Sequence, residues 1–195
     1  MPLDTAAASA PAAARPQEKL RQFSRETAPT GVERLLKDNE LIVSKTDTKG
    51  VITYANETFM RMAGMTEQEA CGAPHSIIRH PDMPRAVFKF LWDRISSGHE
   101  VFAYVVNLAK GGDHYWVLAH VTPTYDSARN IVGYHSNRRK PRREAVDAVV
   151  PLYAKLREIE RNAASKAAGC DAALAYLTAM LEEKGATYDE FIFSI

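Results

Sequence analysis

The stretch Val51-Ile-Thr-Tyr-Ala-Asn-Glu-Thr-Phe59 decides the fold, because it joins a strand pattern to the start of a helix. Its first half is rich in residues that favour strands. The turn residues Thr48-Lys49-Gly50 separate it from a second β-rich run over residues 41–47, which is a hairpin signature. Asn56 then stands where a helix N-cap accepts free backbone N–H groups. The stretch predicts two antiparallel strands that lead directly into a helix.

Short helices and three more strands continue the pattern. Thr66 and Glu69 have the spacing of a capping box, which predicts the start of a helix. Residues 84–97 repeat apolar side chains with a period of about 3.6 residues, as an amphipathic helix does. Further β-rich runs occupy residues 100–108, 115–125 and 131–137. This order predicts an α+β fold, in which short helices cover one face of a five-stranded antiparallel sheet. The other face of such a sheet would be open to partners.

The sequence on either side of residues 35–141 differs in character. Residues 1–34 begin with an Ala/Pro-rich segment, and we expect them to be disordered or partly helical. Residues 142–195 contain two amphipathic stripes with a predicted break near Gly169, followed by an apolar tail from residue 188. They predict a helical hairpin and a tail that docks on the protein itself or on a partner.

Composition excludes several classes of protein. The chain has 25 Lys and Arg against 24 Asp and Glu, a balance that argues against general binding to nucleic acid. It shows neither a secretion signal nor an apolar run of the roughly 18 residues that a membrane span needs, so we expect a cytoplasmic protein. The basic run over residues 138–143 is interpreted as a solvated linker. No nucleophile–base pair or metal-ligand spacing predicts an enzyme or a metal site.

The run Ile78-Arg-His-Pro-Asp-Met-Pro84 carries a guanidinium, an imidazole and a carboxylate on a backbone stiffened by two prolines. Such a rigid polar segment suits a ligand. It equally suits a surface turn that begins a helix, with Asp82 as the cap. The residues of this run leave both interpretations open.

An ordered set of motifs resembles the PAS sensor of bacterial aerotaxis receptors over about residues 39–141. The motifs are the two stretches 51–59 and 78–84, followed by Phe88, Trp92, Asn107, the run 112–117 and Thr122-Pro123. The resemblance implies a non-covalent FAD site between the sheet and the helices that senses redox state. The residues it ties to flavin binding are Arg79, His80, Asp82, Asn56, Phe88, Trp92 and Asn107.

The residue types fit such a site, which should be mostly apolar and aromatic with a few aimed polar groups. Trp92 and Phe88 can pack against a flat ring, but they also fit the core stripe of a helix. Asn107 can offer a donor and an acceptor to the pyrimidine edge. Trp116 and His120 are further candidate cofactor contacts, and His120 and Asn107 are candidates for sensing reduction.

The sequence departs from the aerotaxis pattern at three places on the strands. Val106 stands where a lysine is usual, Val101-Phe102 where a tryptophan is usual, and His120 where an asparagine is usual. These changes imply an altered flavin affinity, redox potential or signalling route, or else a different cofactor.

The leading functional hypothesis is a cytoplasmic redox or oxygen sensor that relays the state of FAD to a signalling partner in another chain, such as a chemoreceptor or a kinase. A homodimer is a further expectation, and neither membrane nor nucleic acid is an expected partner. Two alternatives stay open: a gas sensor that holds haem through one of the six histidines, and a ligand-free PAS interaction module.

Overall fold

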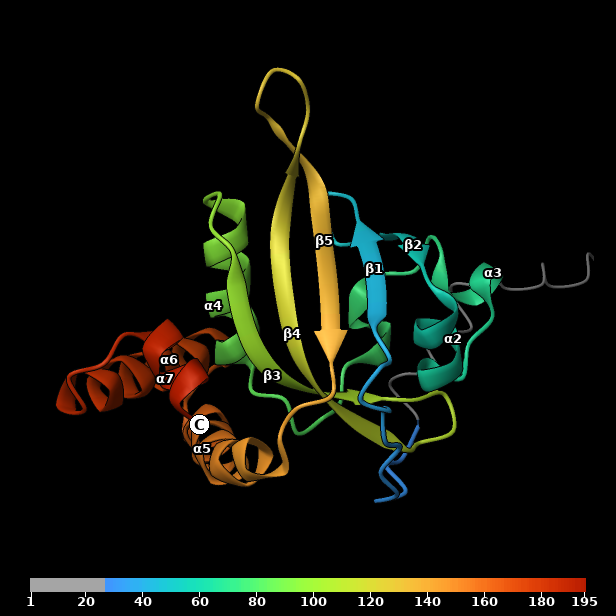
Figure 1. Ribbon diagram of the computed structural model, residues 1–195. Helices are drawn as coiled ribbons and strands as arrows, with labels where there is room; N and C mark the ends of the chain where they lie inside the picture. Colours follow the sequence, from blue (N-terminus) through green and yellow to red (C-terminus); the bar gives the residue numbers. More distant parts are fainter. Residues whose placement is uncertain (1–26) are drawn as a thin grey trace, which may run out of the picture.

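The computed structural model describes residues 27–195 (Figure 1). Its centre is one antiparallel sheet with the strand order β2-β1-β5-β4-β3. The five strands are β1 (Ile42–Thr46), β2 (Ile52–Ala55), β3 (Val101–Leu108), β4 (His114–Tyr125) and β5 (Ile131–Arg139). The α+β fold class and the five-stranded sheet predicted from the sequence are confirmed.

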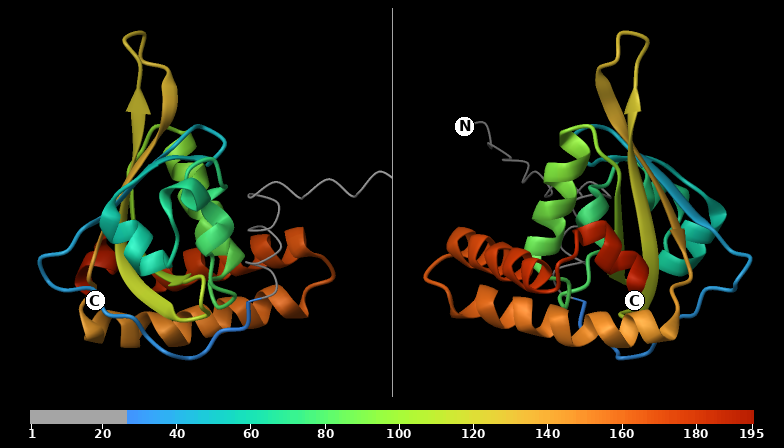
Figure 2. Two further views of the ribbon diagram at one scale, coloured as in Figure 1. Left: turned by 90° about the vertical axis from the view of Figure 1, so that its right-hand side faces the viewer. Right: turned by 60° about the vertical axis from the view of Figure 1, so that its left-hand side comes forward.

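Four short helical segments cover one face of the sheet, which we call the inner face (Figure 2). They are α2 (Glu57–Ala63), α3 (Glu67–Ala70), the 3-10 helix η1 (His75–Ile78) and α4 (Arg85–Ser96). The side chains between this layer and the sheet form the main hydrophobic core.

Asn56 links β1 to α2 as the cap that the sequence predicts. Its Oδ1 accepts from the backbone N–H groups of Phe59 and Val43, each at 3.0 Å, and its Nδ2 donates to the Leu41 carbonyl at 2.8 Å. The predicted capping box of α3 is also present. Local hydrogen bonds thus fix the turn from the first hairpin into the helical layer.

The C-terminal residues form α5 (Arg143–Asn162), α6 (Lys166–Glu183) and α7 (Tyr188–Ser194). The predicted break near Gly169 is wrong, because the turn lies over residues 163–165 and Gly169 is buried inside α6. A Cβ at Gly169 would lie only 2.6 Å from the carbonyl oxygen of Glu160. Glycine at this position therefore allows α6 to pack closely against α5.

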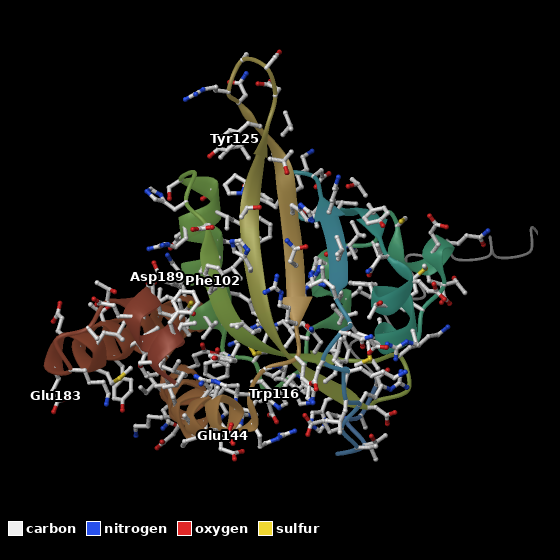
Figure 3. All side chains as sticks on the ribbon, viewed as in Figure 1. Phe102, Trp116, Tyr125, Glu144, Glu183 and Asp189 are labelled. Atoms are coloured by element: carbon white, nitrogen blue, oxygen red, sulfur yellow. The ribbon has the colours of Figure 1, made fainter. Side chains whose placement is uncertain are left out.

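The apolar tail docks on the outer face of the sheet, opposite the inner helices. The ring centroids of Phe102 in β3 and Phe193 in α7 lie 4.7 Å apart, and Tyr104 donates from its hydroxyl to the Ile192 carbonyl at 3.4 Å. Asp189 forms a 2.9 Å ion pair with an arginine of α4. Figure 3 shows Phe102 and Asp189 on this side of the molecule. The expectation of an open outer face is therefore wrong along β3.

Helix α5 also supplies the N-terminal end of α4 with an acceptor. The N-cap of α4 is Pro84, whose side chain makes no hydrogen bond. Glu160 of α5 is 8% exposed, and its Oε1 accepts from the Ala86 N–H at 2.8 Å. One turn earlier, Arg157 forms an ion pair with Asp82. The start of α4 is thus held by two side chains of the C-terminal hairpin.

Replacing Glu160 by alanine is expected to lower the free energy of unfolding by about 1–3 kcal/mol, because the buried Ala86 N–H loses its acceptor. Urea unfolding followed by circular dichroism measures the change. Glu158→Ala is the matched control on the same helix. That side chain is exposed and pairs only with Lys155, so its loss should change stability by less than about 0.5 kcal/mol. Equal effects of the two substitutions would show that Glu160 does not stabilise α4.

Residues 27–34 are ordered without being helical, whereas the expectation for residues 1–34 was a disordered or partly helical segment. The Thr30 N–H donates to the Gly112 carbonyl at 2.9 Å, and Arg34 forms a 2.9 Å ion pair with Asp113. These contacts hold the segment against the turn between β3 and β4, which the composition of the segment alone does not indicate. The expectation for residues 1–26 lies outside the described residues. Among residues 27–195, no helix combines the length and apolar content that crossing a membrane requires.

The basic run 138–143 is not simply a solvated linker. Arg138 is only 3% exposed and lies in the core. Two of the remaining basic side chains pair with acidic residues from an earlier part of the chain: Lys140 with Asp38 and Arg143 with Glu33. Three of the five basic side chains of this run are therefore buried or paired within the chain, and are not free to bind a partner.

Candidate functional site

A cavity of about 350 Å³ lies between the inner face of the sheet and the helical layer, and we call it the sheet–helix cavity. Inward-facing residues of β3, β4 and β5 form its floor, while α4, η1 and the β1–β2 turn form its walls. The residues that line it are Ser44, Thr46, Lys49, Gly50, Pro74, His75, Ser76, Leu91, Trp92, Ile95, Val105, Asn107, Ala119, Val121, Tyr134, Ser136 and Arg138.

Aromatic and aliphatic side chains make up much of the wall. The rings of Trp92 and Tyr134 meet edge to face, with centroids 5.4 Å apart. The Trp92 ring also packs on Gly50, where a Cβ would lie 3.0 Å from it. Gly50 has φ +77°, a conformation that favours glycine, so both the turn and the close contact require this residue. A flat apolar ring would find matching surfaces here.

The polar part of the cavity centres on Arg138. Its Nη2 donates to Ser44 Oγ at 2.8 Å and lies 2.5 Å from His75 Nε2. Burial lowers the pKa of Arg138 to about 10, so the guanidinium stays charged at neutral pH. Burial and the charge of Arg138 hold the pKa of His75 well below its ordinary value, which makes His75 a neutral acceptor.

Three buried polar atoms of the lining residues have no hydrogen-bond partner among residues 27–195: Asn107 Nδ2, Ser136 Oγ and Arg138 Nη1. The Tyr115 hydroxyl, on the strand between them, is likewise unpaired. A buried polar atom without a partner costs about 1–3 kcal/mol, so native proteins rarely leave several in one place. Their gathering around a cavity indicates a site shaped for a ligand with polar atoms of its own.

Only two of the nine residues predicted as cofactor contacts line this cavity, namely Trp92 and Asn107. Their sequence positions explain the agreement. Trp92 lies on the face of α4 that turns toward the sheet, and Asn107 occupies an inward-facing place on β3.

Three other predicted residues come together around a second cavity of about 250 Å³ beside the middle of α5. They are His80, Asp82 and Trp116, and Figure 3 shows Trp116 close to that helix. His80 Nδ1 accepts from the Asp82 N–H at 3.0 Å, and burial lowers the pKa of His80. Asp82 pairs with Arg157. His80 and Asp82 thus join the polar run to the C-terminal hairpin, outside the lining of the sheet–helix cavity.

The remaining four predicted residues make contacts elsewhere. The Arg79 guanidinium stacks on the ring of Phe88 at 4.5 Å and donates a hydrogen bond to the Met83 carbonyl. Arg79 and Phe88 therefore contact each other outside the cavity. The Asn56 amide makes three hydrogen bonds to backbone groups, one as the cap of α2 and two at β1. His120 lies on the outer face, where it stacks on Phe102 and contacts Glu100 at 2.7 Å. The alternation of side chains along β4 places His120 opposite to the cavity-lining Ala119.

The polar cavity residues that sequence reasoning missed include Ser44, His75, Ser136 and Arg138. One signal was available for two of them, since Ser136 and Arg138 follow Tyr134 at every second position and share one face of β5. The polar residues between them hid that period. Among the described residues, no group of three or more His, Cys, Asp or Glu side chains is arranged to hold a metal ion.

Comparison with known proteins agrees with this architecture. Residues 52–138 match the family model described as the PAS fold. Over 118 residues the chain is 42% identical to the aerotaxis receptor of Escherichia coli (strain K12), a match covering 60% of this chain and 23% of the receptor. Over 118 residues it is 26% identical to the bacterioopsin transcriptional activator of Halobacterium salinarum, covering 60% of this chain and 16% of the activator.

The fold itself also occurs in solved structures. A light-oxygen-voltage domain studied with a flavin analogue aligns with a TM-score of 0.51 at 17% identity, covering 59% of this chain and 86% of that one. The chain spans less than a quarter of the length of the two curated relatives. The strand order and the helical layer agree with these matches: the chain has the PAS fold, and part of it is similar in sequence to part of the aerotaxis receptor.

Proposed function

We propose that this chain binds FAD without a covalent bond in the sheet–helix cavity and relays the redox state of the cofactor to a partner protein. The observation that carries the proposal is the combination of an aromatic, apolar wall with three unpaired buried polar atoms. An isoalloxazine ring has the matching form, being flat and apolar with one polar pyrimidine edge. The cavity volume of about 350 Å³ falls in the range of roughly 300–1,000 Å³ that is usual for ligand pockets.

The whole of FAD is larger than a ring, so its ribityl chain and diphosphate would extend through the mouth of the cavity. Lys49 is exposed at that rim and offers a cation to a phosphate. Trp92, 36% exposed, stands beside it and would cover part of the ring. Within the chain, FAD itself would supply the electron chemistry, and the protein would supply binding and electrostatics.

The similarity to an aerotaxis receptor and to a transcriptional activator supports a signalling role, because both relatives are named as signalling proteins. We therefore propose a cytoplasmic location and a protein partner in trans, of the chemoreceptor or kinase kind. The contacts of α5 and α7 with α4 and β3 offer a route from the cavity to the surface of the C-terminal hairpin.

The geometry favours flavin over haem. His75 is the histidine that lines the cavity among the described residues, and its Nε2 faces the charged guanidinium of Arg138. Ligation of iron through Nε2 would require that nitrogen to be free of the guanidinium. The other five histidines lie outside the cavity lining.

Titration of the full chain, stripped of any bound cofactor, with FAD, FMN and haem tests the proposal. We expect one FAD per chain with a dissociation constant of about 1 μM or tighter, measured from the change in flavin fluorescence. Stoichiometric binding of haem in place of FAD would contradict the proposal. Absence of binding by all three would favour a ligand-free interaction module.

A further inference from the structure

Arg138 is a buried cation without a buried anion. Its guanidinium is 3% exposed and lies 5.7 Å from the centroid of the Phe59 ring. Its described partners are neutral, namely the Ser44 hydroxyl and the His75 imidazole, and one of its terminal nitrogens has no partner. No ion pair formed by Arg138 occurs within residues 27–195. Burying such a charge costs several kcal/mol unless an opposite charge accompanies it.

The side chains around Arg138 do not supply the negative charge that would balance its guanidinium. Its titratable neighbours are His75 from η1 and Tyr115 from β4, and burial keeps both uncharged at neutral pH. The cavity lining adds Lys49 and Tyr134, and the described part of the chain contributes no Asp or Glu side chain to it. The cavity thus holds two cations and no anion, and it would attract a ligand whose edge carries or can acquire negative charge.

Resting on the proposed flavin site, we propose that Arg138 sets the charge of the reduced cofactor. Two-electron reduction adds a proton at N5 of the ring and leaves a negative charge over N1 and the neighbouring C2 carbonyl: FAD + 2e⁻ + H⁺ gives FADH⁻. Arg138 would stabilise this charge, so that the second proton at N1, which gives FADH₂, is not taken up. Arg138 would act on the ring through its charge and would take no part in electron transfer. In the experiment below, the electrons come from a dithionite-type donor.

The pH dependence of the midpoint potential of the flavin-loaded full chain tests this role, because its slope counts the protons taken up with the electrons. From mildly acidic to mildly alkaline pH we expect one proton per two electrons in the unchanged protein and in Arg138→Lys. Arg138→Gln, which keeps the polarity and removes the charge, should take up two protons in the acidic part of this range. Its proton affinity at N1 should rise at least tenfold. Arg139→Gln, which removes the exposed neighbouring charge on the same strand, should keep the one-proton slope.

The results separate this proposal from the proposed function. If the unchanged protein binds FAD but takes up two protons as free FAD does at acidic pH, the role of Arg138 is refuted and the flavin site stands. An unaltered slope and potential in Arg138→Gln also refute it. If the unchanged protein binds no flavin, both proposals fail. Should Arg138→Gln not fold, the slopes of the unchanged protein and of Arg138→Lys still decide, because both must show one proton.

Discussion

Ala119→Phe is expected to weaken FAD binding by about 100-fold or more while the chain stays folded. Ala119 lies on β4, between β5 and β3, is 3% exposed, and forms part of the floor of the sheet–helix cavity. A phenylalanine at that place would occupy the space that the flavin ring needs. Because the new side chain enters an existing apolar cavity, the fold should tolerate it better than insertion into a filled core. Flavin fluorescence measures the affinity, and circular dichroism the fold.

The matched control is Thr122→Phe on the same strand. Thr122 is three residues further along and points to the outer face, so the same bulky ring is added without entering the cavity. FAD affinity should then stay within about threefold of the unchanged protein. If both variants lose FAD, the loss reflects damage to β4. If Ala119→Phe keeps full affinity, the flavin does not occupy this cavity.

Asn107→Leu is expected to change stability and affinity in opposite directions. The Asn107 side chain is 3% exposed, and its Nδ2 has no partner. Replacing it by an apolar side chain of similar shape removes an unsatisfied buried group, so the ligand-free protein should become more stable by about 1–3 kcal/mol. FAD affinity should fall by about tenfold or more, because one polar contact to the ring is lost. Urea unfolding without FAD and a binding titration measure the two effects.

Asn56→Ala provides the contrast, since Asn56 is another asparagine predicted as a cofactor contact. Its amide is satisfied by backbone groups of β1 and α2. Its loss should lower stability by about 0.5–2 kcal/mol, and FAD affinity should change only as far as the fold loosens. A stabilising effect of Asn56→Ala, or a destabilising effect of Asn107→Leu, would show that the two roles are assigned wrongly.

The sequence was sufficient for the fold because the fold depends on local patterns. The turn before Val51, the Asn56 cap and the capping box at Thr66 are each specified by a few neighbouring residues. The periodic apolar stripe of α4 likewise indicates its buried face. The docking of α7 and the position of the α5–α6 turn depend on contacts between distant segments. Local sequence patterns therefore left the docking site of α7 undecided and placed the α5–α6 turn at the wrong residues.

The candidate site was less accessible to prediction for the same reason. Arg138 belongs to a basic run that looks solvated, and only the pairing of β5 between β1 and β4 shows that its side chain enters the core. The resemblance predicts that the run 78–84 belongs to the flavin pocket. In the structure, Asp82 of this run forms an ion pair with Arg157 of α5. The resemblance supplied residue types, whereas the direction of each side chain follows from the surrounding packing.

The visible absorption spectrum of the purified full chain, recorded before and after addition of dithionite, tests the central claim most directly. The sheet–helix cavity is expected to hold an oxidised flavin, which gives two bands in the near-ultraviolet and blue that dithionite bleaches and air restores. Release of the chromophore by denaturation, followed by mass analysis, should identify FAD. A single intense Soret band, or a protein that stays colourless after incubation with FAD, would contradict the account.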